Sequence, residues 1–326
     1  MRVLLAIDQS SSSDAAVAFL AHQEFVRPAE LEILSIIPPL PYVDVSGGGA
    51  LGVGMIPDVG EFLAQEQQLV QSTLEATAVK LRNRFHSIQT VVKLGSPERE
   101  VRAYADSHNF DLAVVGAVGH SAVGRILLGS VSDYVATHIQ ASALVIRPST
   151  QHVSDDTAAE PSSQSARQAT KPGSAADAAS DYVPKRILLA VGASDKDQQL
   201  IDELAIFKLS HSTEIHLVHV AQLMTFFRQD LKEHASDFWL KSRVAVVEHL
   251  RRMKETLTNL GFRASSELLS ESHIGEALVT YAQEHQCDLI FACDRQRSFI
   301  DRAVLGSTSR YLLRHAHRSV LIVRGS

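Results

Sequence analysis

Residues 111–130 read DLAVVGAVGHSAVGRILLGS. An uncharged run, Leu112 to Val115, is followed at once by glycines at 116, 119, 124 and 129 and by Ser130. A short apolar run bounded by turn residues is typical of a strand that is buried on both faces of a parallel sheet. The stretch therefore predicts a buried strand, a glycine-rich loop and a helix that starts near Ser130.

The chain contains the same series of sequence blocks twice. The matching pairs are RVLLAID (2–8) with RILLAVG (186–192), FDLAVV (110–115) with CDLIFA (287–292), LGS (128–130) with LGS (305–307), and ALVIR (143–147) with VLIVR (320–324). Because the order of the blocks is preserved, we interpret the chain as a duplication with two domains, 1–148 and 185–326.

The segment 149–184 separates the two copies. It is rich in Ala, Ser, Asp, Gln and Pro and has almost no large apolar side chains. Such a segment cannot bury enough apolar surface to offset the entropy lost on ordering it. We therefore expect 149–184 to be a flexible linker.

Strand and helix patterns alternate within each copy. Expected strands are 2–8, 31–37, 88–94, 111–116 and 143–147, then 186–191, 214–220, 264–269, 288–293 and 319–324; expected helices in the first copy are 12–26, 60–86, 97–108 and 130–140. This alternation predicts an α/β fold of two tandem doubly wound, five-stranded parallel sheets with Rossmann-like topology. Ligands bind such sheets outside the carboxyl ends of the strands, where the glycine-rich stretch lies.

The glycines of this stretch suit a site for an anionic ligand. Gly116 and Gly119 could take positive φ beside a ligand, and Gly129 would let the backbone approach it closely. Each glycine, taken singly, could equally be an ordinary turn or helix C-cap residue.

Hydroxyl groups and one cation could complete this site. The side chains of Ser130 and Ser132, with the first N–H groups of the helix, could hold phosphate oxygens at the positive end of the helix dipole. Arg125 could add positive charge from the loop. The alternative for Ser130 is the N-cap of the helix.

The spacing Gly-x-x-Gly, nine residues, Gly-Ser, followed by Val-Ser, resembles the ATP-binding motif of the universal stress protein family. The resemblance covers both copies and is closest to tandem members with two such domains. It implies an adenine nucleotide alpha hydrolase-like fold, a stress-response regulator, and ATP, ADP or AMP as ligand, with which Mg²⁺ can bind. It also implies that strands 143–147 and 319–324 pair edge to edge in an intramolecular pseudo-dimer, and that the protein forms homo-oligomers.

The resemblance assigns roles to individual positions. Asp8 corresponds to the acidic residue near the nucleoside, and Ile36 to the apolar position beside adenine. The ribose and phosphate segment corresponds to Gly116, Gly119, Gly129, Ser130, Val131 and Ser132. From the residues alone, Asp8 could instead form an N-cap or Asx-turn for the helix near Ser12, and Ile36 could be simply core.

The second copy departs from the motif. In its register Gly116, Gly119 and Gly124 become Cys293, Gln296 and Asp301, Asp8 becomes Gly192, and the two serines survive as Ser307 and Ser309. We therefore expect the second domain to be a degenerate partner that binds nucleotide weakly or not at all.

Composition narrows the function classes. The formal charge of −6 and the aromatic content of 6% argue against nucleic acid as a partner, and no uncharged apolar run is long enough to span a membrane. Two cysteines and no leader pattern before Val3 favour a reduced, cytoplasmic protein. No catalytic set and no metal-ligand cluster stands out, which leaves open a slow ATPase or a nucleotide-independent interaction scaffold as alternatives.

Overall fold

The computed structural model describes residues 1–39, 59–118, 128–148, 183–222, 229–294 and 305–324. Two candidate site residues, Gly119 and Arg125, lie outside these ranges, as does nearly all of the expected linker 149–184.

Strands and helices alternate in both halves as predicted. The N-terminal half contains β1 (Arg2–Ala6), α1 (Ser11–His22), β2 (Glu30–Ile37), α2 (Val59–Leu81), β3 (Ser87–Leu94), α3 (Pro97–His108), β4 (Leu112–Gly116), α4 (Ser130–His138) and β5 (Ser142–Ile146). The C-terminal half contains β6 (Arg186–Ala190), the 3-10 turn η1 (Asp195–Asp197), α6 (Gln198–Leu204), β7 (Glu214–Gln222), α7 (Gln229–Asn259), β8 (Arg263–Glu271), α8 (Ile274–Glu284), β9 (Leu289–Cys293), α9 (Ser307–His315) and β10 (Ser319–Val323).

The ten strands of the described residues form one sheet with the order β3-β2-β1-β4-β5-β10-β9-β6-β7-β8. Neighbouring strands within each half are parallel, so the predicted α/β class is confirmed. The halves meet where β5 and β10 pair antiparallel, with Leu144 opposite Leu321. The expected pairing of the last strands is therefore present, and it removes two exposed sheet edges that would invite aggregation. We call this strand pair and the residues packed around it the seam.

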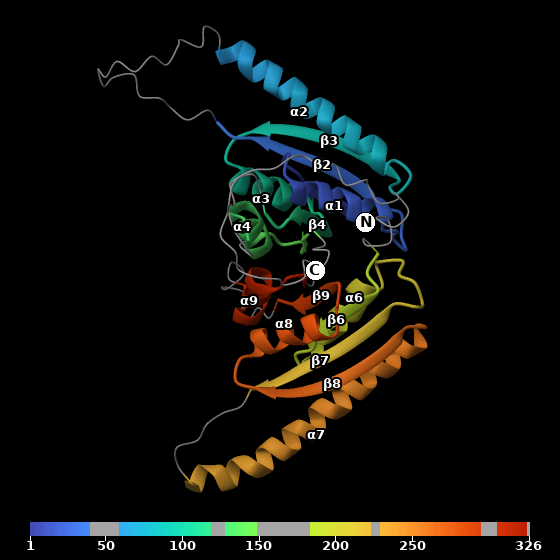
Figure 1. Ribbon diagram of the computed structural model, residues 1–326, viewed down its shortest axis with the longest axis vertical. Helices are drawn as coiled ribbons and strands as arrows, with labels where there is room; N and C mark the ends of the chain where they lie inside the picture. The colour runs from blue at the N-terminus through green and yellow to red at the C-terminus, as the bar shows by residue number, and fades with distance from the viewer. Residues whose placement is uncertain (40–58, 119–127, 149–182, 223–228, 295–304, 325–326) are drawn as a thin grey trace, which may run out of the picture.

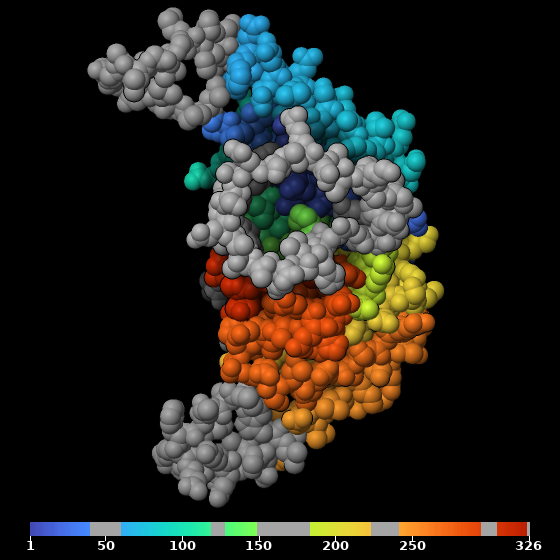
Figure 2. Space-filling model, in the orientation of Figure 1, coloured from blue at the N-terminus to red at the C-terminus, as the bar shows by residue number. Residues whose placement is uncertain are grey.

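Helices cover both faces of the sheet (Figure 1). Consecutive strand residues point to opposite faces, so that Val3 and Leu5 of β1 pack in one apolar cluster and Leu4 in the other. The first cluster includes residues of α1, α2, α6 and α7, and the second includes residues of α3, α4, α8 and α9. Each cluster contains residues of both halves, so the core is continuous across the seam. In Figure 2 the N-terminal half, blue to green, lies above the C-terminal half, yellow to red.

A second contact joins the halves beyond the ends of α1 and α6. Phe25 forms an isolated antiparallel bridge with Phe207, and their ring centroids lie 5.7 Å apart. Lys208 donates its backbone N–H to the Glu24 carbonyl and pairs with the Glu24 carboxylate at 2.8 Å. This contact explains why α1 ends at His22 rather than continuing to residue 26 as predicted.

Two equivalent arginines cross the seam in opposite directions. Arg147 Nη2 donates to the Leu313 carbonyl at 2.6 Å, and Arg324 Nη2 donates to the Ala136 carbonyl at 2.5 Å. Both carbonyls lie near the ends of the helices α9 and α4, where backbone oxygens lack helical partners. The two arginines therefore form equivalent hydrogen bonds between the halves, related by a pseudo-twofold axis. Among the described residues, no helix is both long and apolar enough to cross a membrane.

Candidate functional site

A cavity of about 330 Å³ opens at the carboxyl ends of β1, β2 and β4, beside the start of α4. Every candidate site residue within the described ranges lines it: Asp8, Ile36, Gly116, Gly129, Ser130, Val131 and Ser132. The residues that the sequence suggested for a site thus lie together in the fold, although they come from the ends of β1, β2 and β4 and from the start of α4. The remaining two candidates, Gly119 and Arg125, lie outside the described residues.

One wall of the cavity is apolar. Leu34 and Ile36 come from β2, Val115 from β4 and Val101 from α3. Ile36 is half-buried and packs against the core cluster while it also lines the cavity, so it has the expected core contact, and its place beside adenine stays a prediction. Sequence reasoning missed Leu34 and Val101 as cavity residues, because an apolar strand or helix residue carries no sign of which wall it faces. Such a wall suits a flat, weakly polar ring.

Asp8 shapes the polar edge of the cavity through a compact turn. Its Oδ1 accepts hydrogen bonds from the backbone N–H of Ser10 at 3.1 Å and from the hydroxyls of Ser10 and Ser13 at 2.5 and 2.7 Å. Ser10, not Asp8, is the N-cap of α1. The Asx-turn alternative is therefore correct in geometry, and Asp8, Ser10 and Ser13 all line the cavity. The run of serines at 10–13 was the signal for the two hydroxyls.

Gly116 is required by packing rather than by backbone conformation. A Cβ at this position would lie 2.6 Å from the carbonyl carbon of Ser12 in α1, far closer than atoms can pack. The positive φ considered for Gly116 is wrong: it ends a regular strand paired with Ile146, and the positive-φ glycines of the described chain are Gly95 and Gly261. The missing side chain lets the first turn of α1 reach the end of β4.

The start of α4 forms the opposite edge. Gly129 is the N-cap and Ser130 is the first helical residue, so the prediction of Ser130 as N-cap is wrong. Ser132 donates its hydroxyl to the Gly116 carbonyl at 2.5 Å and thereby ties α4 to β4. The first backbone N–H groups of a helix lack helical partners, and here they belong to residues that line the cavity. They offer hydrogen-bond donors and positive dipole charge to an anion.

One carboxylate near this edge was not foreseen. Ser130 donates its hydroxyl to Glu98 Oε1 at 3.1 Å, and Ser96 donates to Glu98 Oε2 at 2.9 Å. A hydrogen bond from the backbone N–H of Glu98 itself, together with these two hydroxyls, lowers the pKa of Glu98. Glu98 is thus ionised at neutral pH, and its charge opposes a phosphate placed at Ser130.

The equivalent place in the C-terminal half is built differently. Gly192, which replaces Asp8, donates its N–H to Asp197 Oδ1 at 2.8 Å. The same carboxylate accepts the N–H of Ser194 at 2.7 Å and contacts His249 Nε2 at 3.0 Å. Asp197 occupies the position of Ser13 and is only 1% exposed. The acidic group has therefore moved from the strand end to the helix start, where it is buried among its own turn and α7.

Cys293, the counterpart of Gly116, changes the adjoining backbone. Its Sγ contacts the carbonyl of Lys196, the residue equivalent to Ser12, at 3.4 Å. Here the chain forms the 3-10 turn η1 before α6, and Ala193 has a φ of 57°. Ser309 keeps the role of Ser132, donating to the Cys293 carbonyl at 3.3 Å. The side chain at 293 is thus accommodated by displacing the helix start that forms one edge of the N-terminal cavity.

Curated relatives match a stretch of this chain that is about as long as one of its halves. A universal stress protein of Synechocystis sp. is 29% identical over 143 residues, which are 44% of this chain and 84% of that protein. One from Bacillus subtilis is 26% identical over 148 residues, 45% of this chain and 98% of that protein.

The whole chain also has a structural counterpart. The crystal structure of a universal stress protein from Archaeoglobus fulgidus covers 99% of this chain and 96% of its own, with a TM-score of 0.60 and 17% sequence identity. At this identity the likeness shows a shared fold. The family description "Universal stress protein family" matches residues 1–147 and again residues 184–324. The chain therefore belongs to the universal stress protein family, with two copies of the family's domain in tandem.

Proposed function

We propose that the N-terminal domain, 1–148, binds an adenine nucleotide and that the C-terminal domain, 185–326, is its pseudo-dimer partner without an equivalent site. The observation that carries the proposal is the convergence of Asp8, Ile36 and the Gly116 and Gly129–Ser132 segments on one cavity of about 330 Å³. This volume is within the usual range for small-molecule sites.

The cavity offers each part of a nucleotide a matching surface. The base would lie against the apolar wall of Leu34, Ile36 and Val101. The ribose hydroxyls would donate to Asp8, whose carboxylate is held in place by Ser10 and Ser13. The phosphates would accept from the free N–H groups at the start of α4. The Glu98 carboxylate beside Ser130 favours a nucleotide whose phosphate charge is reduced, either by a single phosphate or by bound Mg²⁺.

The proposed role is ligand-responsive signalling in stress rather than rapid turnover. Nucleotide binding would stabilise the contacts among β1, β4 and the helices α1 and α4. Because these elements share continuous apolar clusters with the C-terminal half, occupancy would change the stability of the whole tandem unit.

Isothermal titration calorimetry on the full chain tests the proposal. ATP, ADP and AMP are titrated with and without Mg²⁺ into wild-type protein and into two matched variants, Ser132→Ala and Ser309→Ala. These serines make the same hydroxyl contact in the two halves. We expect Ser132→Ala to weaken binding and Ser309→Ala to leave it unchanged. Absence of binding at millimolar nucleotide, or equal effects of the two variants, would contradict the proposal; phosphate release in the same samples would reveal turnover.

A further inference from the structure

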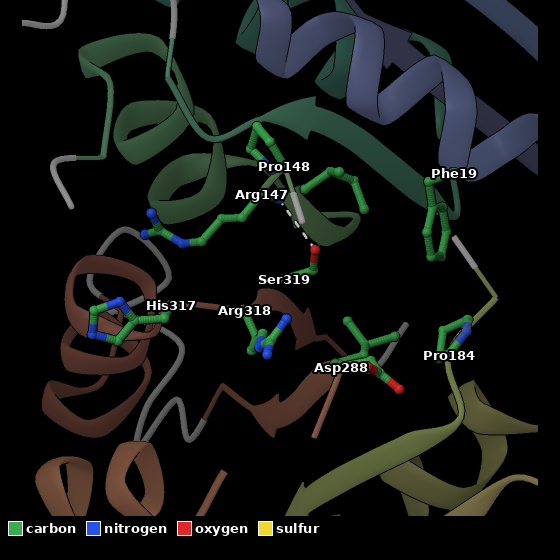
Figure 3. Close-up of a pocket in the computed structure, with 10 residues that line it drawn as sticks. Phe19, Arg147, Pro148, Pro184, Asp288, His317, Arg318 and Ser319 are labelled. Carbon is green, nitrogen blue, oxygen red and sulfur yellow. Dashed lines mark hydrogen bonds between the residues drawn. The ribbon is translucent and has the colours of Figure 1, made fainter. Parts of the chain in front are cut away.

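Two cavities adjoin the seam, and the internal repeat relates them. One, of about 40 Å³, is lined by Phe19, Asp288 and Ser319 among others, and Figure 3 shows the Phe19 side chain extending from α1 toward Asp288 and Pro184. The other, of about 640 Å³, is lined at the equivalent positions by Glu203, Asp111 and Ser142. We call the larger one the Glu203 cavity.

Three replacements distinguish the Glu203 cavity from its counterpart. Glu203 stands where the smaller cavity has Phe19, and the basic side chains His317 and Arg318 are replaced by Gln140 and Ala141. A bulky ring and two basic groups are thus exchanged for a carboxylate, an amide and a methyl group. These exchanges remove a bulky ring and two basic groups from the Glu203 cavity and add a carboxylate to it.

The Glu203 carboxylate is buried with an unused acceptor. Its residue is 9% exposed, and within the described part of the chain no donor reaches its Oε1. The pKa of Glu203 is raised to about 7, mainly by burial. A hydrogen bond from Ser142 lowers this pKa, and the nearby Asp111 carboxylate raises it. A buried acceptor without a hydrogen bond raises the free energy of the folded protein, and a ligand that donates to this oxygen would remove that penalty.

The other charges that line the cavity leave it acidic. Arg324 is neutralised by its 3.4 Å pair with Asp294 and donates to three carbonyl groups, those of Ala136, Thr137 and Ala141. The Met1 ammonium group donates to the Pro28 carbonyl at 3.3 Å. The remaining charged side chains are the carboxylates of Asp111, Asp202 and Glu203 and the exposed Arg27. Besides the paired Arg324, the cavity therefore has three carboxylates against two cations, the Met1 ammonium group and Arg27.

We propose that the Glu203 cavity binds a small organic cation whose ammonium or guanidinium group donates to Glu203 Oε1. The apolar part of such a molecule would lie against Phe110, Val26 and Ile206, which line the same cavity. The described residues place no three His, Cys, Asp or Glu side chains so that they could hold a metal ion together. A cation with N–H donors and a short hydrocarbon chain fits this cavity, because the N–H group can bond to Glu203 Oε1 while the chain contacts the apolar wall. This ligand would join the two domains at a place remote from the nucleotide cavity.

Calorimetric titration of the full chain with agmatine, putrescine and ethylammonium tests this site, with acetate as the anionic control. We expect at least one cation, and not acetate, to bind with one site per chain. Glu203→Gln should weaken that binding by about tenfold to a hundredfold, the range for loss of a charge-assisted hydrogen bond. Affinity should also rise between about pH 6 and pH 8, as Glu203 loses its proton.

Two further variants make the test specific. Glu203→Phe copies the counterpart cavity, where Phe19 is accommodated, and should abolish cation binding in a folded protein. Glu284→Gln, an exposed position on α8, removes the same charge elsewhere and should leave binding unchanged. The proposal is wrong if no cation binds at millimolar concentration, if Glu203→Gln binds as wild type does, or if Glu284→Gln causes an equal loss. Nucleotide titration of the same variants keeps this outcome separate from that of the nucleotide site.

Discussion

Substitution of Gly116 by Ser should destabilise the fold and the nucleotide cavity together. The new Cβ would lie 2.6 Å from the Ser12 carbonyl carbon and 2.7 Å from its oxygen. Ordinary carbon contacts are about 3.5 Å or longer, so the first turn of α1 must move by roughly 1 Å. Overpacking of this kind costs about 1–3 kcal/mol of unfolding free energy. The same movement displaces Ser10 and Ser13 and should weaken nucleotide binding by about tenfold.

The C-terminal half offers a matched control in Gly306→Ser. Among the described residues, and apart from its chain neighbours, no atom lies within 4 Å of a Cβ built on Gly306, which is the N-cap of α9 with a φ of −58°. Serine is favoured at N-caps, so this variant should be neutral or slightly stabilising. Both variants are compared with wild type by urea unfolding followed by circular dichroism, and by nucleotide titration. A Gly116→Ser protein as stable as Gly306→Ser would refute the packing role of Gly116.

Three further substitutions address charges. Because the folded state holds the Glu203 proton up to about pH 7, above the ordinary carboxyl value of 4.5, stability should fall as pH rises through that interval. In the wild-type protein the free energy of unfolding should fall by up to about 3 kcal/mol between pH 5 and pH 8, as measured by urea unfolding. The Glu203→Gln variant should not show this fall. Arg324→Met strands the buried Asp294 carboxylate and should cost about 3–5 kcal/mol in the same assay; a change below about 1 kcal/mol would contradict it. Glu98→Gln removes the charge beside Ser130 and should tighten Mg²⁺-free ATP binding about fivefold by calorimetry, whereas weaker binding would show that the carboxylate assists the ligand.

The strands and the duplicated fold could be predicted because their pattern is local. Segments such as Arg2–Ala6 and Arg186–Ala190 are continuously apolar after their first residue, and burial on both faces of a parallel sheet requires that pattern. Helix ends were less predictable. The end of α1 depends on the pairing of Phe25 with Phe207, a contact between residues far apart in the sequence.

The candidate site was predictable where the motif itself supplies the chemistry. The Gly129–Ser132 segment could be identified because glycines and serines follow a strand end, whereas the role of Asp8 was assigned through the resemblance to the family. The replacement of Asp8 by Gly192 and of Ser13 by Asp197 could not be predicted from the motif. It preserves the turn because the carboxylate moves from the end of the strand to the start of the helix. The Glu203 cavity was equally hidden, since contacts between the two halves, the pairing of β5 with β10 and that of Phe25 with Phe207, bring Glu203 close to Ser142 and Asp111.

The stoichiometry of nucleotide binding tests the central asymmetry most directly. Native mass spectrometry of the full chain with saturating ATP or AMP and Mg²⁺ counts the nucleotides that each chain holds. We predict one nucleotide per chain, reduced by Ser132→Ala and retained in Ser309→Ala. Two nucleotides per chain, or one that is lost through Ser309→Ala and kept in Ser132→Ala, would contradict a site confined to the N-terminal domain.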